Sequence, residues 1–296
     1  MVDFLSHIFF RLHAFYVLGW LELLHSTLIA FAVVSAVLLL ELIFVPWQTS
    51  SIKRLITFSR SVQTDLLAFF LVETNISLFL GMLMFFGITY VAQHHIVRLG
   101  VTIGPLEFNS SVLAFFIFYV FIDFANYWAH RLCHQIPILW TIHRYHHSAR
   151  EMTVFTAARD HPMERALSSM ISALPAALIV VPADQFFIFI LLIKMVGPLK
   201  HSNITSNWGL IGRYLIQSPA AHRIHHSIDP VHHNTNFASL FQFWDVLFRT
   251  AIHPSVAQIR EVNIGVDTDD GQKQPLQYIG QIFIDVGSGL KRMFRV

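Results

Sequence analysis

The sequence predicts an all-helical integral membrane protein, and three observations support this fold class. Hydrophobic residues make up 54% of the 296 residues and charged residues 13%, about half the charged share of an ordinary soluble domain. The mean hydropathy is +0.55. The chain also has 18 histidines, several of them three or four residues apart, as on one face of a helix. We therefore expect about four membrane spans or half-spans together with a histidine-rich helical cap.

The remaining composition narrows this class. A net charge of +2 is too small to indicate a nucleic-acid partner. The one cysteine, Cys133, excludes a disulfide within the chain. Asp3 stands where a signal peptide would carry positive charge, so we do not interpret the N-terminus as a removed targeting segment. Because no linker or change of composition divides the chain, we expect residues 1–296 to form a single membrane-embedded domain.

Three segments are apolar over the length of about 20 residues that a membrane span requires. They cover 27–47, 66–91 and 111–128, and the third runs directly into the first histidines. Residues 4–24 mix charged with apolar side chains, which favours an interfacial amphipathic helix over a span.

The apolar segment 167–197 contains VPADQ near its middle. Pro182, Asp184 and Gln185 are unfavourable midway through a single helix in lipid. The sequence therefore predicts two helices of about 14 residues, joined at 182–184, that form a shallow hairpin. Such a hairpin enters and leaves on one face, so the histidines before and after it would lie on the same side of the membrane.

The basic residues favour the cytoplasmic side for that face. They follow the first span, the third span and the hairpin, whereas the loop at 92–110 has Arg98 as its one basic residue besides histidine. By the positive-inside rule, we expect the histidine-rich region to face the cytoplasm, in a bacterial inner membrane or the endoplasmic reticulum.

Three histidine motifs share one helical spacing. HRLCH at 130–134 places two imidazoles four residues apart, and HRYHH at 143–147 returns 79 positions later as HRIHH at 222–226. Residues three and four apart lie on one face of a helix, whereas adjacent residues diverge by about 100°. One histidine of each HH pair can therefore approach one metal ion while its neighbour approaches a second.

We interpret these motifs as a dinuclear metal site, because eight clustered imidazoles exceed what one ion can bind. Imidazole suits iron, zinc, copper and nickel. The sequence has no HExxH motif of the zinc proteases, and the histidine region has no Glu-x-x-His pair of the carboxylate di-iron bundles. An all-nitrogen, redox-capable pair of metals remains, with interfacial histidines or structural zinc as the alternative.

These motifs and their neighbours resemble the fatty acid hydroxylase superfamily, which includes sterol desaturases, C-4 methylsterol oxidases and alkylglycerol monooxygenases. The resemblance covers roughly 110–250. It implies a di-iron, O2-dependent membrane oxygenase that acts on a lipid C–H bond, with a cytosolic histidine cap above four spans or half-spans. The motifs that carry it are DFANYWAHRLCHQIPILWTIHRYHHS, AARDHPMER, KHSN, SPAAHRIHHS and NTNFASLFQFWDVLFRT.

The resemblance also implies roles for individual residues of this chain. We expect Asp123, on the helical face of the first histidine box, to orient a ligand imidazole in the catalytic site, with a structural hydrogen bond as the alternative. The sequence leaves open whether His232 and His233 bind metal. Arg249 stands where the family has a glycine, which puts the local turn in doubt. The metal ligands that the resemblance implies are His130, His134, His143, His146, His147, His161, His201, His222, His225 and His226.

The expected function is hydroxylation, or desaturation, of an alkyl chain in a lipid or sterol-like substrate. The resemblance implies two iron ions, for which zinc can substitute in purified protein, together with O2 and an electron donor in trans such as a ferredoxin, a cytochrome b5 or a reduced pterin. The nearest rival is an acyl-lipid desaturase, in which the first two boxes are further apart than His134 and His143. A bis-histidine haem protein or a metal permease would need histidines within the spans.

Overall fold

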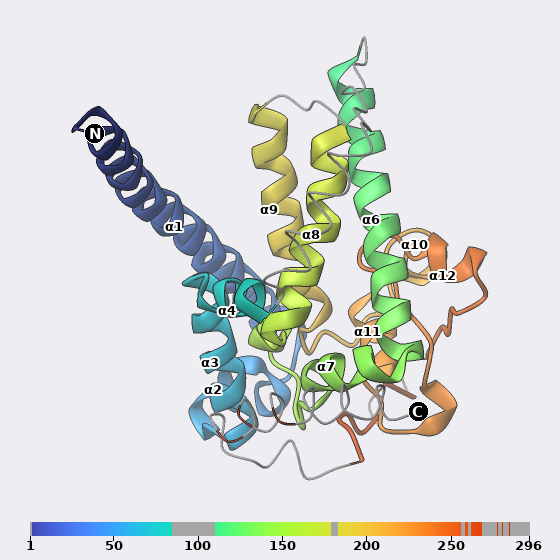
Figure 1. Ribbon diagram of the computed structural model, residues 1–296. Helices are drawn as coiled ribbons and strands as arrows, with labels where there is room; N and C mark the ends of the chain where they lie inside the picture. The colour runs from blue at the N-terminus through green and yellow to red at the C-terminus, as the bar shows by residue number, and fades with distance from the viewer. Residues whose placement is uncertain are drawn as a thin grey trace, which may run out of the picture.

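The computed structural model describes residues 2–84, 110–178, 183–255, 258–259 and 262–267, with the single positions 277, 280 and 284. Within these residues the elements are helices, joined by two isolated β-bridges at Ile216–Phe241 and Ser227–Ile264. The predicted all-helical fold is therefore confirmed. Figure 1 shows long helices rising from a layer of short helices, and that layer carries the histidine motifs.

The N-terminal helix α1 covers Val2–Phe44, and its part Leu23–Phe44 is long and apolar enough to cross a membrane. This part agrees with the span predicted at 27–47. The helix ends before Pro46, because a residue that precedes proline is disfavoured in helical conformation. The interfacial helix predicted at 4–24 is not separate from the span, since no proline interrupts the helix between them.

The span predicted at 66–91 is wrong as a single helix. Helix α3 (Arg60–Glu73) ends within this segment, and a second helix, α4 (Ile76–Met84), begins after Asn75. The φ of Asn75 is +57°. Asparagine is one of the few residues that adopt this left-handed conformation readily. Residues 85–91 of the predicted span lie outside the described residues.

An elbow precedes this break. The 3-10 turn η1 (Trp47–Thr49) leads into α2 (Ser51–Thr57), which meets α3 at 105°, and Phe58 between them has a φ of +52°. The hydroxyl of Ser59 caps α3 by accepting from the Val62 amide. By length and hydropathy, the described chain has two helices that can cross a membrane, or three spans if this bent pair counts as one.

The second long helix and the hairpin rise from the cap in a common direction (Figure 1). Helix α6 (Ser111–Gln135) contains the candidate span Val112–Gln135, which confirms the prediction at 111–128 and extends it through the first histidines. The apolar segment 167–197 is divided between two helices, as predicted. These are α8 (Pro162–Leu178) and α9 (Ala183–Lys200). The joint was predicted at 182–184. Residue 182 lies outside the described residues, and 183 and 184 begin α9. Both hairpin ends adjoin the cap.

Helix α4 packs closely against the start of α8. A Cβ added to Gly81 would lie 1.9 Å from the carbonyl oxygen of Pro162, far inside van der Waals contact. A side chain at this position would therefore displace the first turn of α8. That turn carries Glu164, which contacts the histidine cluster described below.

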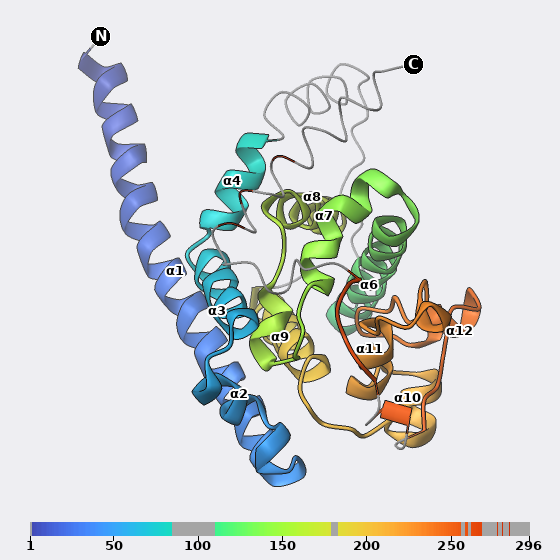
Figure 2. The same ribbon diagram turned by 90° about the horizontal axis from the view of Figure 1, so that it is seen from below.

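Short helices form the cap beneath the long ones. Figure 2 shows α7 and α11 near the centre of the molecule, flanked by α1–α3 on one side and by α10 and α12 on the other. The elements of the cap are α7 (Pro137–His147), η2 (Val154–Ala158), α10 (Gly209–Tyr214), α11 (Pro219–His225), η3 (Pro230–His232) and α12 (Phe243–Leu247).

Arg249 adopts a backbone conformation that suits glycine. Its φ is +58°, directly after α12, and its side chain is exposed. Because this conformation costs an L-residue about 1–2 kcal/mol, Arg249→Gly is expected to raise the free energy of unfolding by about 1 kcal/mol. Thermal unfolding in detergent should show a higher midpoint for Arg249→Gly, with no gain for Arg249→Ala, which removes the same charge but keeps the Cβ. A gain in both variants would assign the effect to the charge instead.

Candidate metal centre

Nine histidines of the cap and of the adjoining ends of α6 and α9 gather into two neighbouring groups. Within each group, one nitrogen per histidine lies within 4.8 Å of the others, a spacing that one metal ion can bridge. Helix α6 supplies the HRLCH pair, α7 the HRYHH histidines and α11 the HRIHH histidines up to its C-cap, while His201 directly follows α9. Group 1 consists of His130, His134, His143, His147 and His225, and group 2 consists of His146, His201, His222 and His226.

The two groups adjoin each other through the HH pairs. His146 belongs to group 2 and its neighbour His147 to group 1, and the same division separates His226 from His225. The rings of His147 and His226 stack between the groups, 4.3 Å apart with an interplanar angle of 22°. The roughly 100° divergence of adjacent helical residues produces this division.

Hydrogen bonds to Nδ1 orient three imidazoles of group 1. Nδ1 of His130 lies 2.8 Å from the carbonyl oxygen of Phe237, and Nδ1 of His225 lies 2.7 Å from that of Thr235. Carbonyl oxygens accept but never donate, so each Nδ1 carries the proton and each Nε2 keeps its lone pair. His143 Nδ1 contacts a Glu164 carboxylate oxygen at 2.6 Å in the same way.

The free lone pairs of group 1 point at a common centre. The Nε2 atoms of all five histidines are buried and have no hydrogen-bond partner among the described residues. A buried polar atom without a partner is costly, and a bound metal ion removes that cost. This pattern, with Nδ1 held by an acceptor and Nε2 exposed to the centre, is how histidine ligands are usually fixed.

In group 2 the imidazole nitrogens lie close to one another. Nε2 of His222 lies 2.9 Å from Nε2 of His201 and 3.1 Å from Nε2 of His226, and Nε2 of His146 lies 3.1 Å from that of His201. Nδ1 of His201 donates to the carbonyl oxygen of Gly197 at 2.8 Å, so its Nε2 also offers a lone pair. Four imidazole nitrogens at this separation match the edges of a coordination sphere with bonds of about 2 Å.

Burial keeps five of these imidazoles neutral, which is the form that binds metal. It lowers the pKa of His201 and of His225 to about 3, with a smaller contribution from neighbouring charges. Burial and then the adjacent imidazoles lower the pKa of His146, His222 and His226 well below the usual 6.5. Neutral, convergent, all-nitrogen donor sets suit iron and zinc. The residues present therefore fit a pair of such ions.

The structure places the remaining predicted residues outside the two groups. His161 is buried at the start of α8, where its Nδ1 accepts from the Met163 amide at 3.1 Å. Asp123 accepts hydrogen bonds from the Leu240 and Phe241 amides and from the Trp244 indole. Its carboxylate therefore fastens the loop before α12, and among the described residues no hydrogen bond joins it to a histidine.

The two loop histidines whose role the sequence left undecided, His232 and His233, also lie outside the two groups. Nδ1 of His232 contacts the Ser227 hydroxyl at 2.9 Å, and His233 is exposed. Asn236 and Asp245 tie the last loop to the cap: Asn236 exchanges hydrogen bonds with the Ile252 backbone, and Asp245 accepts from the Phe237 and Ala238 amides.

Sequence reasoning missed the buried polar groups that position the histidines. Asn203, two residues after His201, donates to the carbonyl oxygen of Met152 at 3.0 Å and accepts from Arg223 at 2.7 Å. It thereby joins the segment after HRYHH, the segment after His201 and helix α11. Its backbone amide donates to the carboxylate of Glu41 at 2.6 Å. The one charge within the first apolar segment was the available signal for this contact.

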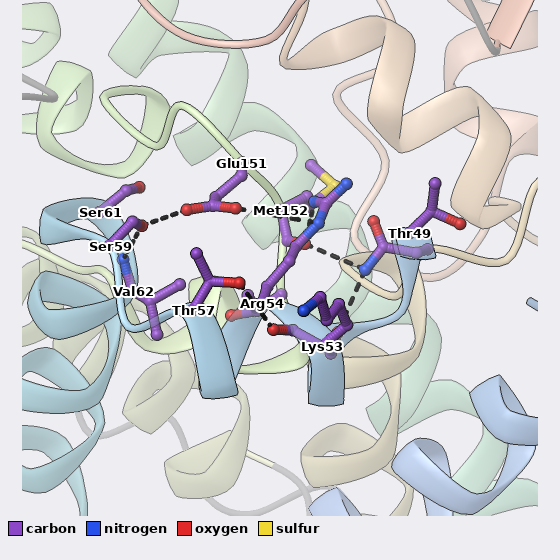
Figure 3. Close-up of polar contacts among 12 residues, drawn as sticks. Thr49, Lys53, Arg54, Thr57, Ser59, Ser61, Val62, Glu151 and Met152 are labelled. Atoms are coloured by element: carbon purple, nitrogen blue, oxygen red, sulfur yellow. Dashed lines mark hydrogen bonds and ion pairs between the residues drawn. The ribbon is translucent and has the colours of Figure 1, made fainter. Parts of the chain in front are cut away.

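The elbow of α2 and α3 holds the segment that follows HRYHH, as Figure 3 shows. Arg54 donates to the carbonyl oxygen of Met152 at 2.6 Å and lies 4.0 Å from the carboxylate of Glu151. The hydroxyl of Ser59 donates to the same carboxylate. These contacts fix the chain that follows α7 against α2 and the start of α3.

Replacing Glu41 with alanine is expected to weaken metal binding at group 2 selectively. Its carboxylate is fully buried and accepts from the backbone amides of Ser51 and Asn203, both at 2.6 Å. Without it, two buried donors lose their acceptor and the segment beside His201 is released. Loss of an outer hydrogen bond typically costs 10–100-fold in metal affinity. Metal titration should show one weakened site of two, whereas Glu73→Ala, which breaks a half-buried pair with Lys194, should leave both unchanged.

Cavity 1, of about 290 Å³, adjoins both groups. Away from the histidines it lies between α6, α8 and α9, where Ile122, Leu167 and Val196 line it. Ile122 lies within the candidate span of α6. Asn126 and Lys200 give its wall polar groups near the histidines. The histidines that it touches are His130 and His143 of group 1 and His146, His201 and His222 of group 2.

The known proteins to which this chain is similar include a monooxygenase, a lipid hydroxylase and an aldehyde decarbonylase. The chain is 29% identical over 152 residues to an alkylglycerol monooxygenase of Danio rerio, covering 48% of this chain and 31% of that protein. It is 28% identical to ornithine lipid hydroxylase OlsE of Rhizobium tropici, covering 49% and 44%. It is also 28% identical to very-long-chain aldehyde decarbonylase GL1-10 of Oryza sativa subsp. japonica, covering 49% and 47%. The chain thus spans between about a third and a half of the length of these curated relatives.

No solved structure matches the chain. Residues 115–250 match the fatty acid hydroxylase family, and this range contains every histidine of both groups. The resemblance stated from the motifs is therefore confirmed, and the histidine-bearing region of this chain belongs to the fatty acid hydroxylase family, as a distant homologue of the alkylglycerol monooxygenases and of ornithine lipid hydroxylase OlsE.

Proposed function

We propose that the chain is a membrane-bound, O2-dependent di-iron oxygenase that hydroxylates an alkyl C–H bond of a lipid. One observation carries the proposal: two groups of convergent imidazoles, most of them buried, adjoin one cavity that extends along α6 into a candidate membrane span. The family match and the printed names of the relatives, an alkylglycerol monooxygenase and an ornithine lipid hydroxylase, support a lipid substrate.

The metal ligands in this proposal are the nine histidines of the two groups. Iron bound there supplies the activation of O2, which no amino-acid side chain provides. The protein's part is to orient the imidazoles, through the Nδ1 hydrogen bonds of His130, His143 and His225. His161, at the start of α8, lies outside both groups, and its role as a further ligand stays a prediction.

The second task of the protein is to position the substrate. Lipid tails reach cavity 1 from the bilayer side, where its walls are Ile122, Leu167 and Val196. These apolar walls exclude water and hold one part of the chain next to the histidines, which restricts attack to nearby carbons. Asp123 acts as a positioning residue here, because it fixes the loop that brings Leu240 to the cavity wall.

We also propose the domain, the membrane face and the electron donor that the sequence predicts. The whole chain forms one membrane-embedded unit whose chemistry lies within 110–250. The basic residues around the cap favour the cytoplasmic face. Electrons come from a donor in trans, a ferredoxin, a cytochrome b5 or a reduced pterin. Desaturation of the same alkyl chain is the alternative outcome, because removal of a second hydrogen atom competes with hydroxylation.

Iron-loaded protein in lipid vesicles, supplied with a chemical reductant and 18O2, tests this proposal. Mass spectrometry of the lipids should show products that contain one labelled oxygen, or products that have lost two hydrogens if the enzyme desaturates. His143→Ala should abolish them, and His253→Ala, which changes an exposed histidine outside both groups, should not. A haem absorption band, or products that persist in His143→Ala, would contradict the proposal.

A further inference from the structure

A second cavity reaches the histidines from another side. Cavity 2, of about 400 Å³, is bounded by the end of α6, by Trp140 of α7, by the loop after α11 and by residues 265–267. It shares no lining residue with cavity 1. It touches His134, His147 and His225, all members of group 1, and no histidine of group 2.

Group 1 therefore lies between two cavities. Cavity 1 touches His130 and His143, and cavity 2 touches the other three histidines of the group. The Nε2 atoms on both sides are buried without a partner among the described residues. A ligand in either cavity can therefore approach the centre of group 1, whereas among the cavities named here only cavity 1 touches group 2.

The wall of cavity 2 is part of the fold. The amide of Gly265 donates to the carbonyl oxygen of His226 at 3.1 Å, and the amide of Ile228 donates to that of Asn263 at 3.0 Å. These bonds fasten segment 263–267 to the end of the HRIHH motif. Gly265 has a φ of +129°, which L side chains rarely adopt, so the turn there requires glycine.

The two cavities differ in what surrounds them. The rim of cavity 2 carries His233, Asn234 and Asp267, all polar and exposed, and none lies in a candidate span. The far wall of cavity 1 includes Tyr119 and Ile122, which lie within the candidate span of α6. Polar, exposed side chains are typical of a surface in water, and a lining within a span is typical of a surface open to lipid.

We propose that cavity 2 is a separate, water-facing entrance to group 1, through which small polar molecules reach its metal without passing the lipid-binding cavity. The inference rests on the proposed metal site. A lipid that fills cavity 1 closes that approach to both groups. A co-reactant dissolved in water, such as a small anion or a small reductant, then has cavity 2 as its path, and it reaches group 1 first.

Azide binding to cobalt-loaded protein in lipid nanodiscs, where lipid occupies cavity 1, tests this entrance without any turnover. Cobalt uptake is measured first, and stopped-flow absorption then follows azide association. Val266→Trp fills cavity 2, and Val196→Trp is the matched substitution in cavity 1, since both valines are half-buried. Asp267→Trp, at the exposed rim, narrows cavity 2 without burying the new ring. All variants should retain two cobalt ions per chain.

We expect Val266→Trp to slow azide association at group 1 at least about tenfold, equivalent to about 1.4 kcal/mol of barrier, with a smaller slowing in Asp267→Trp. Val196→Trp should leave the rate within about twofold of the parent. Equal rates in all proteins, or slowing in Val196→Trp alone, would overturn the second entrance and leave the metal site standing. A parent protein that takes up no cobalt would overturn the proposed function itself.

Discussion

Replacing Asp65 with alanine is expected to lower the free energy of unfolding by about 3–5 kcal/mol, because it leaves a buried guanidinium without its partner. Asp65 and Arg159 are both almost completely buried, and Nε of Arg159 lies 2.6 Å from the carboxylate. The same carboxylate accepts hydrogen bonds from the hydroxyls of Thr153 and Thr156. The change therefore removes three interactions at one point.

This loss reaches the metal centre through Arg159. Its guanidinium also donates to the hydroxyl of Ser148, the residue directly after His147. Asp65→Ala should therefore lower metal content as well as stability. Urea unfolding in detergent measures the first effect, and Arg165→Ala is the control. Arg165 is 44% exposed and 3.6 Å from Asp160, so its loss should cost less than about 1 kcal/mol. Similar costs for both variants would contradict the buried-pair account.

Lowering the pH from 6.5 to 5 is expected to destabilise the metal-free protein by about 3 kcal/mol through His201 and His225 alone. Burial lowers the pKa of each to about 3 in the folded state, whereas an exposed histidine titrates near 6.5. Between these values the unfolded chain binds protons that the folded chain does not. The stabilisation is therefore complete above pH about 6.5 and is lost as the pH falls toward 3.

Thermal unfolding of chelator-treated protein at several pH values measures this dependence. Each of the two histidines should contribute a slope of about 1.4 kcal/mol per pH unit in that range. His225→Gln, which cannot titrate, should show a shallower slope than the parent. Metal-loaded protein should resist acid further, because protons must displace the metal before they bind its ligands. Stability that does not change between pH 7 and 5 would show that the imidazoles are accessible to protons when folded.

Local spacing made much of the histidine site predictable. Residues four apart share a helical face wherever the helix forms, so the histidines four apart in HRLCH, HRYHH and HRIHH were predictable as members of one group. The return of the hairpin to one face was predictable from Pro182 and Asp184, which are unfavourable within a span. The break at Asn75 was not, because an asparagine in an apolar run can also be accommodated inside a helix.

The groups that hold the histidines in place depend on contacts between distant segments. Glu41 and Asn203 are 162 positions apart, Asp65 and Arg159 are 94 apart, and His143 contacts Glu164 from 21 positions away. No local spacing encodes such pairs in a single sequence. A buried charge in an apolar segment, as at Glu41, indicates that a partner exists but does not identify it.

Iron content per chain decides whether the two groups form a dinuclear site. We expect two iron ions per chain in protein purified anaerobically from iron-rich medium, and two in the control His253→Ala. His225→Ala, which removes a nitrogen from group 1, and His222→Ala, which removes one from group 2, should each lose at least one ion. A parent protein with one ion or none, or unchanged content in both ligand variants, would contradict a dinuclear site built from these two groups.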